Sequence, residues 1–169
     1  MIRLRPLKRR DCESIVLWLQ EERQFSMWSM GTFHYPLTIA QLEDYMVQVE
    51  REEDAWSMAA LDKEGRLVGH FAVRKANYQE NYAYLGFIVV DPEQRGKGLG
   101  KEMVTMAVRY AFEVMKVNKV TLNVIEENRA ALACYLSIGF QVEERIEQKN
   151  LGGESWTLCR MLKCGSEEK

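Results

Sequence analysis

The stretch YAYLGFIVVDPEQRGKGLGKEM, residues 82–103, joins an apolar run to a glycine-rich motif and the start of a helical pattern. Its first nine residues are mostly apolar, which is typical of a central strand buried on both faces. The apolar spacing that follows predicts a helix from about Gly98 to Val114. Because KVTLNV at 119–124 predicts another strand, this strand–helix–strand unit requires a parallel crossover within one sheet.

The motif Arg95-Gly96-Lys97-Gly98-Leu99-Gly100 lies between that strand and that helix and predicts an anion-binding loop. Free backbone N–H groups and the helix dipole favour an anion at a helix start. Glycine lets the backbone approach the anion closely. The side chains of Arg95 and Lys97 add positive charge.

Two other phosphate motifs fail when they are compared residue by residue. A Walker P-loop needs Ser or Thr after Gly-Lys, and here Glu102 follows Lys101. A dinucleotide fingerprint needs a third glycine, and that position falls on Lys101 or Met103. A GTPase and a dehydrogenase are therefore disfavoured.

The element pattern predicts an α/β (α+β) fold with one mixed, mostly antiparallel sheet of about seven strands and about four flanking helices. The expected strands are 2–7, 56–62, 66–75, 82–90, 119–124, 140–147 and 155–162. The expected helices are 11–22 (capped by Asp11), 38–50 (capped by Thr38), 98–114 and 128–140, with 24–39 irregular. The last two strands enclose a turn at 150–153. A single domain is expected over 1–164, followed by a frayed tail at 165–169.

Composition excludes several classes. The 169 residues carry a net charge of −2, which argues against general nucleic-acid binding. No apolar stretch has the length of a membrane helix, and the N-terminus lacks a signal-peptide core. The four cysteines form no CxxC pair and the two histidines are isolated, so neither a metal site nor a disulfide framework is expected. We expect a reduced, cytoplasmic protein.

The segment V-V-D-P-E-Q-R-G-K-G-L-G resembles the acyl-CoA pyrophosphate loop of the GNAT family of N-acetyltransferases. That family's signature, Arg/Gln-x-x-Gly-x-Gly/Ala, is met by Arg95, Gly98 and Gly100. The predicted element order also resembles the family fold over nearly the whole chain. Within the family, the sequence is most similar to the branch that contains ribosomal-protein N-terminal and spermidine acetyltransferases.

The resemblance implies acetyl-CoA as co-substrate, without a metal. The pantetheine arm would pair with the backbone of the strand before the loop, and a backbone N–H near Val89 would polarise the thioester carbonyl. The implied cofactor contacts are Ile88, Val89, Val90, Arg95, Gly96, Lys97, Gly98, Leu99, Gly100, Lys101 and Asn128. Asn128 is also a natural helix cap, so it has either role or both.

Tyr135, seven residues after that Asn, matches the family's general acid; its alternative is an aromatic side chain on a buried helix face. The general base is not identified. In the ribosomal-protein alanine acetyltransferases a Glu lies on the strand before the Asn, but Asn123 stands here. Glu126, Glu127 and Glu80 are nearby candidates, although each is also an ordinary surface charge. A water chain would serve too.

The expected acceptor is a primary amine, with a protein N-terminal amine preferred and a polyamine or other small amine as the alternative. A tyrosine pair of the alanine-specific branch is absent, because 147–150 reads Glu-Gln-Lys-Asn. An aromatic segment that includes Trp28, Phe33, His34 and Tyr35 either lines the acceptor pocket or caps the core. A non-catalytic acyl-CoA sensor and a homodimer also stay open.

Overall fold

The structure is a computed structural model that describes residues 1–149 and 153–165. One seven-stranded sheet has the order β1-β2-β3-β4-β5-β7-β6. Its strands are β1 (Arg3–Pro6), β2 (Trp56–Leu61), β3 (Leu67–Asn77), β4 (Tyr82–Val90), β5 (Lys119–Ile125), β6 (Gln141–Lys149) and β7 (Ser155–Cys164). β4 and β5 run parallel and the other neighbouring pairs run antiparallel. The predicted mixed sheet is confirmed.

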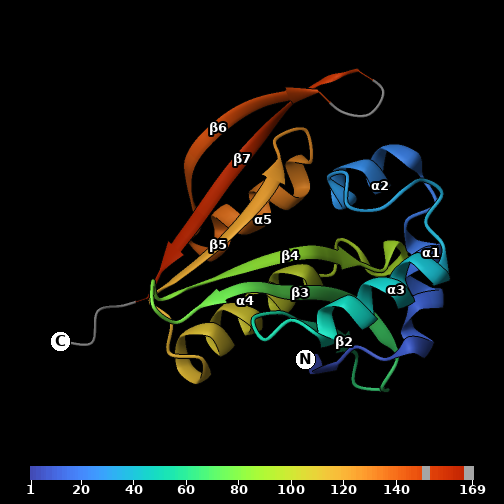
Figure 1. The fold of residues 1–169 in the computed structure, drawn as a ribbon, viewed down its shortest axis with the longest axis horizontal. Helices are drawn as coiled ribbons and strands as arrows, with labels where there is room; N and C mark the ends of the chain where they lie inside the picture. Colours follow the sequence, from blue (N-terminus) through green and yellow to red (C-terminus); the bar gives the residue numbers. More distant parts are fainter. Residues whose placement is uncertain (150–152, 166–169) are drawn as a thin grey trace.

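Helices cover both faces of this sheet (Figure 1). The α-helices in the described ranges are α1 (Cys12–Trp18), α2 (Glu22–Ser29), α3 (Ile39–Glu50), α4 (Leu99–Arg109) and α5 (Arg129–Ile138). The short turns are 3-10 at Arg9–Asp11 and Pro92–Gln94 and π at Tyr110–Val114. α4 and α5 contribute Met103 and Tyr135 to one buried cluster, and α1, α2 and α3 contribute Ile15, Phe25 and Leu42 to a second. Apolar burial on both faces stabilises the sheet between two helical layers.

Residues 24–29, in the segment expected to be irregular, belong to α2, a helix that the sequence analysis did not predict. The Glu21 carboxylate caps this helix by accepting hydrogen bonds from the N–H groups of Arg23 and Gln24, at 3.0 and 2.9 Å. Its buried face includes Ser29, whose hydroxyl accepts a bond from the Phe33 N–H at 2.8 Å. A polar residue on the buried face concealed the helical period from pattern analysis.

The sequence analysis expected the Asp11 side chain to cap a helix, but it makes no capping hydrogen bond to α1. Its buried carboxylate instead accepts hydrogen bonds from both terminal nitrogens of Arg5, at 2.7 and 2.8 Å, and from the Lys8 N–H at 2.7 Å. Burial alone would raise the pKa of Asp11, but these hydrogen bonds and the Arg5 charge hold that pKa below its usual value. The carboxylate therefore joins β1 to the turn before α1.

Other local predictions are confirmed. The Thr38 hydroxyl caps α3 by accepting from the Gln41 N–H at 3.3 Å. The Asn128 side chain caps α5, and Gly139 ends it in the left-handed region with φ of 98°. The turn predicted at 150–153 lies outside the described residues except for its last position. In the predicted frayed tail, the Gly165 N–H donates to the Asn118 carbonyl at 2.8 Å, and 166–169 lie outside the described residues.

Candidate active site

The two parallel strands separate halfway along their length. Tyr82–Leu85 of β4 pairs with Lys119–Leu122 of β5, and beyond this point the two strands diverge (Figure 1). A register shift in the β3–β4 ladder accompanies a positive φ of 50° at Phe87, which bends β4 at the point of divergence. The edge of β4 that faces β5 is therefore left without strand pairing from Gly86 onward.

The ladder alternation shows which backbone groups face this opening. The Asp91 N–H donates to the Val68 carbonyl at 3.0 Å, so these two residues form a hydrogen-bonded pair with β3. In an antiparallel ladder the next pair is not hydrogen-bonded, and here it is Gly69 with Val90. The N–H of Val90 therefore points away from β3 toward the opening, whereas that of Val89 points to β3.

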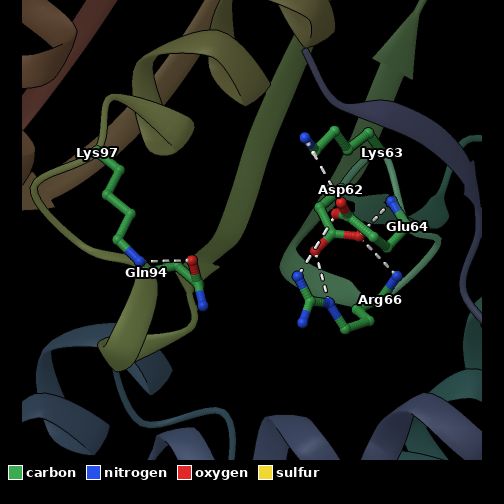
Figure 2. Close-up of polar contacts among 6 residues, drawn as sticks. All are labelled: Asp62, Lys63, Glu64, Arg66, Gln94 and Lys97. Atoms are coloured by element: carbon green, nitrogen blue, oxygen red, sulfur yellow. Dashed lines mark hydrogen bonds and ion pairs between the residues drawn. The ribbon is translucent and has the colours of Figure 1, made fainter.

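The glycine loop connects β4 to α4 in a conformation that favours glycine. Gly96 and Gly98 have φ of 74° and 79°, and a Cβ on either would meet no heavy atom within 4 Å. The space over the loop is therefore open to a ligand. Arg95 donates to the Gln24 side chain at 3.1 Å, which joins the loop to α2. Figure 2 shows Lys97 folded back on the loop, where its ammonium donates to Gln94 at 2.9 Å.

The loop, the open edge of β4, α2 and α5 enclose a cleft of about 1000 Å³, at the upper end of the range for small-molecule sites. Of the predicted site residues, those that line it are Ile88, Val89, Val90, Arg95, Gly96, Gly98, Leu99, Gly100, Lys101, Asn128 and Tyr135. The exception is Lys97, which lies outside the lining; its ammonium donates to the Gln94 side chain at 2.9 Å.

Tyr135 reaches the cleft from α5 and is 6% exposed. Its ring packs edge-on against Phe140, with centroids 6.2 Å apart. Burial raises the pKa of Tyr135, and the nearby Cys134 and Tyr84 raise it further. Among residues 1–149 and 153–165 its hydroxyl has no hydrogen-bond partner. The phenol therefore stays protonated at neutral pH and is free to donate to a ligand.

The candidate bases differ in their position relative to the cleft. Glu126 binds Arg145 at 3.0 Å and lies outside the cleft lining. Glu80 lies in the turn before β4, at the end of that strand opposite the glycine loop. Glu127 lines the cleft but is exposed, and its carboxylate accepts from the Thr157 N–H at 3.4 Å. Asn123 also lines the cleft.

Arg74 on β3 and Tyr84 on β4 are among the cleft residues that the sequence analysis missed. They are cross-strand partners, and that pairing is invisible in a single strand pattern. From the predicted aromatic segment, Trp28 lines the cleft, whereas Phe33 is buried and stacks on Trp28 with centroids 5.3 Å apart. The other two aromatic side chains of that segment, His34 and Tyr35, are exposed and lie outside the lining.

A sequence profile of the Acetyltransferase (GNAT) family matches residues 10–140. The chain belongs to this family. It is an N-acetyltransferase of the GNAT type that uses acetyl-CoA as its acyl donor. In the described ranges, no three His, Cys, Asp or Glu side chains gather to hold a metal, and no helix is long and apolar enough to cross a membrane.

Two curated relatives of this GNAT chain differ in how much they share with it. Spermidine N(1)-acetyltransferase of Escherichia coli (strain K12) is 25% identical over 161 residues, 95% of this chain and 84% of the relative. N-alpha-acetyltransferase MAK3 of Arabidopsis thaliana is 30% identical over 90 residues, 53% of this chain and 47% of the relative.

A solved structure of spermidine N-acetyltransferase from Vibrio cholerae, in complex with CoA and spermine, superposes with a TM-score of 0.85 at 24% identity. It covers 98% of this chain and 96% of that chain. This similarity shows the fold.

Proposed function

We propose that this chain acetylates the primary amine of a small molecule. The observation that carries the proposal is the single cleft that joins the glycine loop, the open edge of β4 and the protonated Tyr135. The full-length relatives named for spermidine favour a small amine over the protein N-terminal amine that the sequence analysis preferred. The relative named as an N-alpha-acetyltransferase matches only about half of the chain.

The residues present fit acetyl-CoA. Gly96 and Gly98 leave open space over the N-terminus of α4, where a pyrophosphate would meet free N–H groups. Arg95 and Lys101 add charge at the same end of the cleft. The open edge of β4 supplies backbone partners for an extended pantetheine arm. The Val90 N–H, rather than that of Val89, faces the opening and can donate to this arm.

Acetyl-CoA supplies a thioester: the amine nitrogen forms a bond to the acetyl carbon, the carbon–sulfur bond breaks, and the amine loses a proton while the sulfur gains one. Tyr135 supplies the proton for the sulfur, because its phenol is protonated and faces the cleft. Glu127 is exposed, so we assign removal of the amine proton to water rather than to a buried carboxylate.

Release of CoA thiol from acetyl-CoA tests the proposal. The acceptor panel holds small amines, peptides with a free α-amine, and acetyl-capped lysine peptides, with Tyr135→Phe as the control. We expect thiol release that depends on Tyr135 and on a small amine. Release with peptides alone would overturn the small-amine assignment. Binding of acetyl-CoA without release with any amine would favour a cofactor-sensing module.

A further inference from the structure

The acceptor side of the cleft contains a cation that the cofactor does not explain. Arg74 lies on β3 opposite Tyr84, on the face that carries α1, α2 and α3. The glycine loop follows the far end of β4, so its phosphate ligands lie at another part of the cleft. Arg74 is instead beside Gly86, where β4 and β5 begin to diverge.

Arg74 is partly buried, and no residue in the described part of the chain accepts a hydrogen bond from its guanidinium. In the described ranges its guanidinium takes part in neither an ion pair nor a hydrogen bond. Its Cζ lies 5.0 Å from the centroid of the Phe87 ring, a contact that orients the group and leaves its N–H donors unused. Removing such donors from water without an acceptor costs free energy, so the arrangement is suited to an anionic ligand.

A second unpaired donor lies on the same wall. The indole nitrogen of Trp28 is buried and has no hydrogen-bond partner among the described residues, and Trp28 lines the cleft. Its ring centroid is 5.1 Å from that of Phe87, the ring that also carries Arg74. The Arg74 guanidinium and the Trp28 indole, two groups with unpaired hydrogen-bond donors, thus both contact the Phe87 ring in the cleft wall.

The charge of the cleft does not favour a polycation. Its described lining has five basic side chains, Arg23, Arg74, Arg95, Lys101 and Arg129, and two acidic ones, Glu21 and Glu127. Both oxygens of Glu21 accept hydrogen bonds from the start of α2, and Glu127 accepts one from β7. Of the basic residues, Arg95 and Lys101 lie at the cofactor end, and Arg23 pairs with Glu154 at 3.8 Å. Arg74 is a basic residue of the acceptor side, where an ammonium group of a polycation would meet a charge of its own sign.

Tyr84 connects this anion site to the reacting end of the cleft. It is the cross-strand partner of Arg74, and a Cβ on Gly86 would lie 3.0 Å from its ring and 3.5 Å from Cδ of Arg74. Tyr84 and Tyr135 both line the cleft, and the electrostatic interaction between the two phenols contributes to the raised pKa of Tyr135. An acceptor held by Arg74 at one end is thus directed along Tyr84 toward Tyr135.

We propose that the acceptor is a small amine that also carries a carboxylate, and that Arg74 binds this carboxylate while the amine faces the thioester. This inference rests on the proposed function and narrows its substrate class. Arg74 acts as a specificity residue, and its guanidinium fork matches the two oxygens of a carboxylate.

The test compares acceptors that carry a carboxylate with acceptors that lack one. The purified chain receives acetyl-CoA and either an amino acid or its carboxamide, drawn from the twenty common amino acids, with β-alanine, γ-aminobutyrate, an alkylamine and spermidine alongside. We expect at least one amino acid to exceed its carboxamide and spermidine in kcat/KM by about tenfold or more. Equal rates for acid and carboxamide, or a preference for spermidine, would overturn the inference while leaving the proposed function intact.

Substitution identifies the residue responsible. Arg74→Met keeps an unbranched apolar side chain over Phe87, and we expect it to lower kcat/KM for the amino acid by about tenfold or more while changing that of the carboxamide by less than about twofold. Arg74→Lys should lie between the two. Arg51→Met, just after α3 and outside the cleft lining, is the matched control.

Thermal unfolding and the Kd for CoA distinguish a specificity role of Arg74 from a structural or cofactor-binding role. We expect both quantities to stay close to the parent values in Arg74→Met. A weaker affinity for CoA, or an equal loss with acid and carboxamide, would make Arg74 a cofactor or structural residue and overturn the inference. Silence with every amine, despite CoA binding, would overturn the proposed function and this inference with it.

Discussion

The two halves of the cleft are built in different ways. The cofactor half comes from one continuous segment, in which β4, the glycine loop and α4 follow one another along the chain. The acceptor half is assembled from α2, β3 and α5, which are far apart in sequence. In the cofactor half, the order of residues along the chain determines which groups lie side by side. In the acceptor half, the binding groups come together only when distant elements pack. Substitutions in each half test this division.

The largest effect is expected where the halves meet. Tyr135→Phe should lower kcat by about 100-fold, because the sulfur loses its proton donor. The Kd for CoA should stay unchanged, since the remaining ring still packs against Phe140. Single-turnover kinetics and titration with CoA would check both expectations. Turnover at the parent rate would remove Tyr135 from the chemistry.

His70 on β3 lies next to the cofactor half, because it is the cross-strand partner of Val89 on β4. Burial lowers its pKa from 6.5 to about 4, although its Nδ1–H donates to the Met58 carbonyl at 2.9 Å. As the pH falls, His70 is therefore protonated in the unfolded chain at a higher pH than in the folded chain. The contribution of His70 to stability is complete above about pH 6.5 and is lost as the pH falls toward 4.

We therefore expect the free energy of unfolding to fall by about 2 kcal/mol from pH 7 to pH 5 because of this one group. Urea unfolding at both pH values would measure the loss. His70→Asn should remove most of that pH dependence, although it lowers stability at neutral pH. His34→Asn, at an exposed histidine, should leave the dependence in place. The same pH dependence in both variants would contradict the assignment.

Gly98→Ala tests the cofactor loop against a matched turn. Gly98 and Gly65 have φ of 79° and 83°, and neither has a heavy atom within 4 Å of an added Cβ. Each substitution should cost roughly 1 kcal/mol of stability through backbone strain. The Kd for CoA should rise about tenfold for Gly98→Ala only, because its methyl group enters the ligand space.

Gly65 is a suitable control because its turn has no cofactor role. The Asp62 carboxylate holds that turn together by binding Arg66 at 2.9 Å, and Glu64 also binds Arg66 at 3.5 Å (Figure 2). Calorimetric titration with CoA would compare the two variants. An equal loss of affinity in both would mean that strain alone, rather than phosphate contact, governs the result.

The smallest effect is expected for Glu127→Gln. An exposed carboxylate competes with water as proton acceptor, so kcat/KM should fall by less than about threefold. Glu126→Gln is the control, because that side chain binds Arg145 outside the cleft lining. Rates measured across a panel of pH values would check this expectation. A loss near 100-fold would instead make Glu127 the base, in place of water.

Most of the cofactor half was predictable from sequence. Strand 82–90, the loop and the following helix were located correctly because hydrophobic period, glycine and the helix N-terminus are local signals. Lys97 is the exception, since its direction depends on Gln94 in the folded loop. The role of Asp11 was missed for the same kind of reason: its partner Arg5 is supplied by β1, and the local pattern favoured a cap.

The sequence by itself determined the family fold, the glycine loop and the position of Tyr135, because each depends on residues that are close together in the chain. Only the tertiary structure decided the divergence of β4 from β5, the direction of the Val90 N–H and the wall formed by Arg74, Tyr84 and Trp28. Strand register and side-chain burial arise from long-range packing. The chemistry of the acceptor half depends on both, and a one-dimensional pattern records neither.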